Sequence, residues 1–154
     1  MGATDLPNSD HVAVSEAPID AASLVSLVTD PSAGAVVLFL GTVRDHSPGR
    51  TAVTALEYET YGEVVEGRIR GILVEARTRH SVVCIAAVHR LGSLGVGEIS
   101  VGVAVSSEHR PDAFAAAHFV IDELKATAPI WKKEIYEDGS AWVAGYAENP
   151  APRS

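Results

Sequence analysis

The sequence predicts one α+β domain built around a largely antiparallel sheet. Two long stretches repeat their apolar residues at helical spacing, and short apolar or alternating runs lie around them. Neighbouring runs are joined by short segments, which suit antiparallel strands, because parallel strands need a crossover of a dozen or more residues. The 154 residues match the size of one domain. We expect residues 11–146 to form it, between a flexible N-terminus at 1–10 and a flexible tail at 147–154.

The N-terminal part of the chain predicts a short strand within 11–19 and a helix over 20–28. Asp20 is able to cap that helix. Residues 34–44 are apolar and β-branched without alternation, which predicts a central strand buried on both faces. Alternating residues at 52–58 predict the next strand, which we expect to pair with it antiparallel across a polar loop.

Two long helices are expected. Residues 62–80 carry one apolar stripe with charged residues outside it. Pro111 suits the first turn of a second helix, where its missing N–H is not needed, and Pro129 forbids continuation. The expected buried stripe of this second helix comprises Phe114, Ala117, Ile121 and Leu124.

Four further strands complete the prediction. Residues 82–89 and 98–106 are apolar runs joined by a glycine-rich connection. Residues 130–136 form the next expected strand, and a turn at Asp138-Gly139 leads into the last one, 141–146. Because strands and helices are interleaved with short connections, the pattern favours α+β over a doubly wound sheet.

Composition excludes several classes of protein. A net charge of −8 gives no broad cationic face for a nucleic-acid backbone. The longest apolar run, 35–40, is too short to span a membrane, and no basic segment followed by an apolar one marks a secretory signal. The single cysteine, Cys84, forms no internal disulfide. We therefore expect a cytoplasmic protein. The six histidines show no metal-ligand spacing, so no metal is expected.

The cations are concentrated at the ends of the expected elements. All three lysines of this acidic chain lie within nine residues, at positions 125, 132 and 133. Further cations at the ends of elements are Arg44, the pair His89-Arg90 and the pair His109-Arg110. If these ends gather on one side of the sheet, the cations converge on an anion, with the amides at the start of the Pro111 helix adding favourable dipoles. The residues alone therefore indicate an anion-binding domain.

Each of these cations also has a structural explanation. Lys125 falls in the last turn of a helix, where the macrodipole favours a cation, and Arg44 suits a solvated strand end. Lys132 and Lys133 alternate in a strand and must face opposite ways, so at most one points into a shared pocket. Periodicity does not choose between them.

Four segments give a more specific signal than any single residue. They are FLGTVR at 39–44, LEYETY at 56–61, HRLGSL at 89–94 followed by Gly97-Glu98, and a block from Ser106 to Glu134 that ends in LKATAPIWKKE. In order and spacing they resemble the large, catalytic subunit of molybdopterin synthases, the MoaE family, across roughly residues 34–143.

The resemblance implies an α/β-hammerhead-type fold with an added antiparallel β portion. It implies a homodimer at the centre of a heterotetramer, whose other subunit is a small ubiquitin-like sulfur carrier with a thiocarboxylated Gly-Gly tail. The implied substrate is cyclic pyranopterin monophosphate (precursor Z). This sulfurtransferase would add two sulfurs to it, in molybdenum cofactor biosynthesis, without a cofactor of its own.

The resemblance also assigns roles to individual residues. The family's essential lysines fall on Lys125 and Lys132, and its substrate-contacting residues fall on Arg44, His109 and Arg110. Lys125 would serve as the acid–base group and Lys132 would mainly position phosphate or thiocarboxylate. One departure is Ala144-Gly145-Tyr146, where some members carry a basic residue that reaches the neighbouring protomer. The alternative hypothesis is a non-catalytic carrier-binding or anion-binding module of the same fold.

Overall fold

The computed structural model of the chain describes residues 7, 9–47, 52–60 and 63–143. It contains two four-stranded sheets and three helices in these residues, which confirms the α+β class. In chain order the elements are β1 (His11–Ser15), α1 (Ala21–Val28), β2 (Ala35–Thr42), β3 (Val53–Thr60), α2 (Glu63–Arg79), β4 (Cys84–Arg90), β5 (Gly92–Gly95), β6 (Ile99–Ser107), α3 (Arg110–Thr127), β7 (Ile130–Tyr136) and β8 (Gly139–Val143). The tail at 147–154 and most of residues 1–10 lie outside the described residues.

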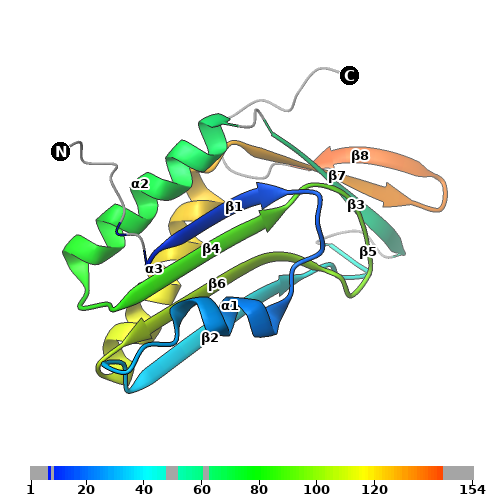
Figure 1. Cartoon of the computed structure of the whole chain (residues 1–154). Helices are drawn as coiled ribbons and strands as arrows, with labels where there is room; N and C mark the ends of the chain where they lie inside the picture. The colour runs from blue at the N-terminus through cyan, green and yellow to red at the C-terminus, as the bar shows by residue number, and fades with distance from the viewer. Residues whose placement is uncertain (1–6, 8, 48–51, 61–62, 144–154) are drawn as a thin grey trace.

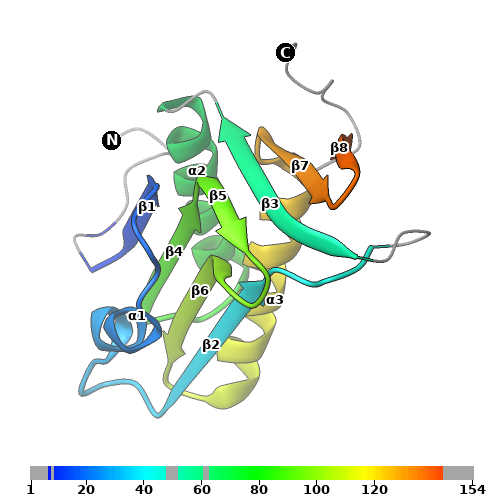
Figure 2. The same ribbon diagram turned by 90° about the vertical axis from the view of Figure 1, so that its right-hand side faces the viewer.

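The first sheet has the strand order β1-β4-β6-β2 and carries the main core. Its β4–β6 and β6–β2 pairs are antiparallel, and β1 pairs with β4 in parallel. Helices α2 and α3 cover one face and α1 covers the other (Figures 1 and 2). Apolar residues of α2 and α3 pack on alternate residues of β4 and β6, while Leu24 and Val28 of α1 pack on the opposite set. The central strands β4 and β6 are thus buried on both faces.

Local signals explain where the helices begin. The Asp20 carboxylate accepts a hydrogen bond from the Ala22 amide at 3.0 Å and caps α1 as predicted. Pro111 stands in the first turn of α3 as predicted. Helix α1 lies so close to β6 that a Cβ atom on Gly102 would be 2.4 Å from Cδ1 of Leu24, which explains a glycine in a buried strand.

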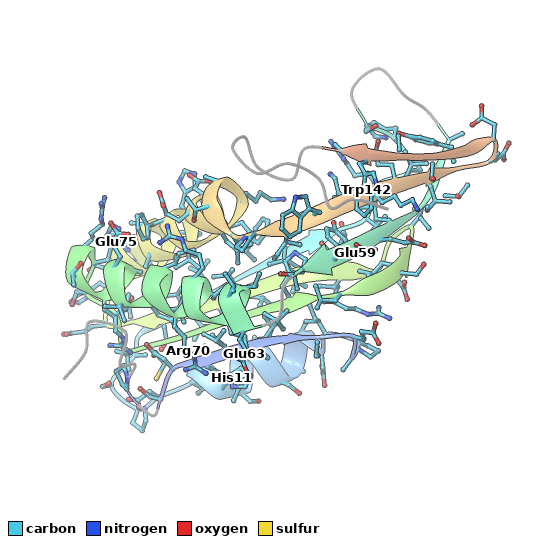
Figure 3. All side chains as sticks on the ribbon, turned by 90° about the horizontal axis from the view of Figure 1, so that it is seen from above. His11, Glu59, Glu63, Arg70, Glu75 and Trp142 are labelled. Carbon is cyan, nitrogen blue, oxygen red and sulfur yellow. The ribbon has the colours of Figure 1, made fainter. Side chains whose placement is uncertain are left out.

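The second sheet has the order β5-β3-β7-β8 and is wholly antiparallel. It provides the antiparallel β portion added to the main layers, with a small core of Val43, Val53, Leu56 and Leu94. Figure 3 shows this sheet, with Glu59 on β3 and Trp142 on β8, extending past the end of α2 where Glu63 lies. Glu75 marks the opposite end of that helix. The second sheet and the C-terminal end of α3 together form the candidate site.

Three sequence predictions need correction. Strand β2 is an edge strand with mostly half-exposed residues, since an apolar run without alternation does not distinguish an edge from a centre. Strand β3 does not pair with β2; the chain passes into the second sheet, where β3 pairs with β5 and β7. The glycine-rich connection contains strand β5, which was not predicted.

The buried stripe of α3 also differs from the prediction. Phe114 is 62% exposed, whereas Ala113, Ala116 and Val120 are buried with the expected Ala117, Ile121 and Leu124. The stripe is centred on small residues, because α3 lies close to the sheet. Phe114 therefore leaves an apolar side chain in solvent near the N-terminal end of the helix.

Asp10 is hydrogen-bonded to the core, although it is the last residue of the N-terminal segment that was expected to be flexible. Its carboxylate is fully buried and accepts hydrogen bonds from Arg77 Nη2 at 2.6 Å and from the Ile85 amide at 2.9 Å. Arg77 also donates to the Val83 carbonyl at 2.6 Å. This network joins the entry to β1 with α2 and β4.

Candidate functional site

A cavity of about 310 Å³ opens between the C-terminal end of α3, the end of β2 and the face of the second sheet. Its size is within the usual range of small-molecule sites. The lining includes three cations, one carboxylate and several hydroxyls: Gly41, Thr42, Arg44, His46, Leu56, Tyr58, Ser100, Lys125, Lys132 and Glu134. Three of the five sequence-predicted site residues, Arg44, Lys125 and Lys132, therefore meet in one place.

The two lysines reach the cavity from different elements. Lys125 is an exposed residue in the last turn of α3, where the helix dipole favours a cation. Lys132 is half-buried on β7, opposite Tyr58 of β3 in the strand register. The next residue, Lys133, faces the other side of the sheet, where its Nζ lies 5.6 Å from the centre of the Trp142 ring. Strand alternation thus separates Lys132, in the cavity, from Lys133, outside it.

Arg44 and His46 lie at the mouth of the cavity. Both follow β2 and both are exposed. Nδ1 of His46 lies 2.8 Å from a carboxylate oxygen of Asp45, and this hydrogen bond lowers the pKa of the Asp45 carboxyl. The exposed Arg44 guanidinium therefore places a positive charge beside the cavity, an arrangement that attracts anionic ligands.

A smaller recess of about 60 Å³ lies behind the lysines and has a more apolar lining. Tyr58, Ser100, Lys125 and Lys132 border both spaces, and His89 forms part of the recess. Nδ1 of His89 donates to the Arg90 carbonyl at 2.8 Å, which leaves Nε2 as the acceptor of the neutral ring. Burial lowers the pKa of His89 to about 4. His89 is therefore uncharged near neutral pH and adds no positive charge to the site.

Burial and charge shift the pKa values of two groups that face the cavity. Burial lowers the pKa of Lys132, and the positive charges of Lys125 and Arg44 lower it further, whereas Glu134 acts in the opposite direction. Burial also raises the pKa of Tyr58, so its phenol keeps its proton. Lys132 thus loses its proton more readily than an exposed lysine, and Tyr58 remains a hydrogen-bond donor.

His109 and Arg110 lie outside this cavity in the single chain. His109 caps the N-terminal end of α3 and Arg110 is its first residue, whereas Lys125 is in the last turn. An 18-residue helix is roughly 25 Å long, so the two groups of cations are at opposite ends. Within one chain, therefore, only three of the five predicted site residues share a cavity.

Of the polar groups beside the cations, the sequence analysis named only His89, as a cation at the end of a strand, and it did not single out Tyr58, Ser100 or Glu134. Tyr58, His89, Ser100 and Glu134 come from four different strands, and their proximity depends on the pairing of the two sheets. Of the three missed residues, only Glu134 had a usable signal, because it stands two residues after Lys132 and must share its face of β7.

Within the described residues, no group of three or more histidine, cysteine, aspartate or glutamate side chains is placed to hold a metal ion. None of the helices in the described ranges is both long enough and apolar enough to cross a membrane.

The fold and the cavity define an α+β domain with an anion-binding pocket that carries two amines. Residues 14–127 match the model of the MoaE protein family. The chain belongs to this family.

Individual relatives agree with this assignment. Over 124 residues the chain is 50% identical to a molybdopterin synthase catalytic subunit of Oryza sativa subsp. indica, covering 80% of this chain and 64% of the relative. The chain thus spans less than two thirds of that relative's length. A protein of the same name from Thermoplasma volcanium is 42% identical over 130 residues, covering 84% of this chain and 94% of the relative. The crystal structure of a molybdopterin synthase from Staphylococcus aureus has a TM-score of 0.79 at 35% identity, covering 90% of this chain and 98% of that one.

Proposed function

We propose that this chain is the catalytic subunit of a molybdopterin synthase. The proposed reaction converts cyclic pyranopterin monophosphate to molybdopterin with two sulfurs from the thiocarboxylated C-terminus of a small sulfur carrier. The observation that carries the proposal is the convergence of Arg44, Lys125 and Lys132 on one cavity of about 310 Å³. The names of the relatives support it, since they are called catalytic subunits of this enzyme.

The charge of the cavity suits the two proposed reactants. The cyclic phosphate of the substrate and the thiocarboxylate of the carrier are both anionic, and they repel each other when they approach. Three cations around one cavity offset that repulsion and hold both groups near one another. The chain as a whole carries a charge of −8, so attraction of anions is confined to this region.

The proposed chemistry in each round has two steps. The thiocarboxylate sulfur attacks a side-chain carbon of the substrate and forms a C–S bond, while the oxygen on that carbon leaves with a proton. Water then cleaves the bond between sulfur and the carrier's acyl carbon, releasing the carrier as a carboxylate and leaving the sulfur on the substrate. A second round adds the other sulfur at the neighbouring carbon. At one of the two carbons the displaced oxygen belongs to the cyclic phosphate, so cleavage of that C–O bond opens the ring and leaves a phosphate monoester.

Both lysines have proposed roles in these proton transfers. Lys125 is the acid–base group assigned by the resemblance, and its ammonium is able to donate the proton that accompanies the leaving oxygen. Lys132 has a lowered pKa, which makes its neutral amine available as a proton acceptor for the attacking water. When protonated, Lys132 also positions the phosphate or thiocarboxylate. Tyr58, which keeps its proton, donates a hydrogen bond to either anion.

The assembly is part of the proposal. The small subunit is a ubiquitin-like carrier whose Gly-Gly tail enters the cavity, and two copies of this chain form a homodimer at the centre of a heterotetramer. His109 and Arg110 lie at the exposed end of α3, so we propose that they contact substrate in the cavity of a second copy. The proposed location of this assembly is the cytoplasm.

Reconstitution tests the proposed function. The purified chain would be mixed with a thiocarboxylated carrier and cyclic pyranopterin monophosphate, and the dithiolene product would be followed after oxidation to its fluorescent derivative. We expect product that depends on both partners. Binding of the carrier without any product would contradict the proposal and favour a non-catalytic module, and product formed without a carrier would indicate a different enzyme.

A further inference from the structure

The cationic cavity contains one buried carboxylate, and simple anion binding does not explain it. Glu134 is 4% exposed and lines the same cavity as Arg44, Lys125 and Lys132. A buried carboxylate is unfavourable unless its oxygens are hydrogen-bonded or paired. In a site that only held phosphate, its negative charge would also weaken binding of the ligand. Glu134 therefore needs a function other than attracting anions.

The structure holds the carboxylate by one of its oxygens. Oε1 of Glu134 accepts hydrogen bonds from the Ser47 hydroxyl at 3.0 Å and the Tyr136 hydroxyl at 2.6 Å. Neither donor is a cation. Among the described residues, both side-chain donors to Glu134 bind Oε1 and no cation lies within ion-pair distance, although the charge of Glu134 acts on Lys132. The second oxygen remains an acceptor for a ligand.

Glu134 and Lys132 are placed to contact different parts of one ligand. They are two residues apart on β7 and face the same side, so their Cα atoms lie roughly 7 Å apart along the strand. Lys132 is opposite Tyr58 of β3, and Glu134 is opposite Leu56. The cavity thus has an acidic end beside an apolar side chain and a cationic end beside a phenol. A ligand that fits must have hydrogen-bond donors at one end and an anion at the other.

We infer that Glu134 is a specificity-determining residue that recognises the donor edge of an aminopyrimidinone ring. Oε1 is held by Ser47 and Tyr136, and Oε2 accepts a hydrogen bond from the exocyclic amino group of the ligand. The inference rests on the proposed function, because the proposed substrate carries such a ring together with a phosphate. Carboxylate acceptors discriminate strongly here, since a ligand without the donor leaves a buried charge unpaired.

Ligand pairs test the inference without any sulfur transfer. The first probe is a pterin that carries a phosphate ester, and the second is its 2,4-dioxo counterpart, in which oxygen replaces the amino group. Binding of each to the full chain is followed by fluorescence of the ring. We expect the pterin to bind roughly 10- to 100-fold more tightly, as for a lost hydrogen bond to a buried charge. Equal affinities for the two probes would overturn the inference, whether or not any variant folds.

The Glu134→Gln variant adds a second test, because it should weaken binding of the pterin probe and strengthen binding of inorganic phosphate. Loss of the carboxylate should weaken binding of the pterin probe and abolish the preference over the dioxo probe. The same change removes a negative charge from a cationic cavity, so inorganic phosphate should bind more tightly. A merely structural role would change both affinities in the same direction. Thermal unfolding of the variant checks its fold, and Lys133→Gln, on the other face of β7, is the matched control that should change neither affinity.

The two proposals fail in distinguishable ways. If the native chain forms the dithiolene product but shows no preference between the two ring probes, the inference about Glu134 is wrong and the proposed function stands. If the ring preference is present and no dithiolene forms with a bound carrier, the sulfur-transfer function is wrong and the recognition of the ring edge stands.

Discussion

The two ends of helix α3 carry cations in contrasting surroundings. At the C-terminal end, Lys125 faces Lys132 and Arg44 across a cavity that also contains a buried carboxylate. At the N-terminal end, His109 and Arg110 are exposed, and among the described residues His109 has only Glu108 within ion-pair distance, at 3.5 Å. Both ends belong to the same rigid helix, so the difference arises from what stands opposite. The second sheet faces the C-terminal end, and no described element encloses the N-terminal end.

This difference shows that one chain by itself forms a cavity around the cations at only one end of α3. The C-terminal end is a concave site with changed protonation, because burial and neighbouring cations lower the pKa of Lys132. The N-terminal end offers cations and a helix dipole without a concave surface, so solvent screens its charges. If both ends contact one substrate, two copies of the chain must supply them.

The largest expected effect is the loss of activity when the amine of Lys125, at the C-terminal end of α3, is removed. Lys125→Ala should reduce the rate of dithiolene formation by roughly 100-fold or more, in the range for removal of a general acid–base group. Carrier binding should persist, and native gel or calorimetric binding checks it. Lys133→Ala is the matched control, since Lys133 contacts Trp142 on the outer face. Near-normal turnover in Lys125→Ala would contradict the role assigned to that end of the helix.

Mixing two inactive variants tests whether the ends act in different copies. Arg110→Ala and Lys125→Ala proteins, dissociated and reassociated together, should regain about a quarter of native activity, because half of the dimers are mixed and each has one intact site. Neither variant alone should show this activity. If the mixture stays inactive although mixed dimers are detected by mass spectrometry, the two residues act within one chain or Arg110 has another function.

Part of the site was predictable, because it rests on short-range signals. Arg44, Lys125 and Lys132 were predicted because each stands at the end of an expected helix or strand. The family resemblance favoured Lys132 over Lys133, and in the structure Lys132 lines the cavity while Lys133 lies over Trp142 on the other face of β7. Glu134 was not predicted, since its burial depends on Ser47, 87 residues earlier in the chain. Sequence periodicity carries no information on such long-range contacts.

The fold shows the same limit. The helices and most strands were predicted because capping residues, prolines and apolar spacing are local. The edge position of β2 was not, because an apolar strand covered by α1 and α3 on its two faces resembles a central one in sequence. The separation of β2 from β3 into different sheets was also missed, since hairpin pairing is the usual outcome of a short loop.

A smaller effect is expected on the pH dependence of the reaction rate, which Lys132 would control from the cavity at the C-terminal end of α3. If neutral Lys132 accepts a proton, the rate rises with pH through the pKa of Lys132, which is below the usual lysine value. Arg44→Ala removes one of the cations that lower this pKa, so the rise should move to higher pH. The limiting rate at saturating substrate, measured from pH 6 to 10, checks the direction. A shift toward lower pH would show that another group controls the rate.

The smallest effect concerns the exposed end of α3. Phe114 is 62% exposed and Ile121 is 7% exposed on the same helix, so they form a matched pair. Ile121→Ala should lower the free energy of unfolding by about 2–5 kcal/mol, as for a core truncation. Phe114→Ala should change it by less than about 0.5 kcal/mol in dilute solution, as for a surface residue. Urea unfolding at several protein concentrations separates two outcomes. An unchanged stability at every concentration would leave Phe114 free in solvent. A loss that appears only at high concentration would place it between two copies, at the end of the helix whose cations lack a cavity of their own.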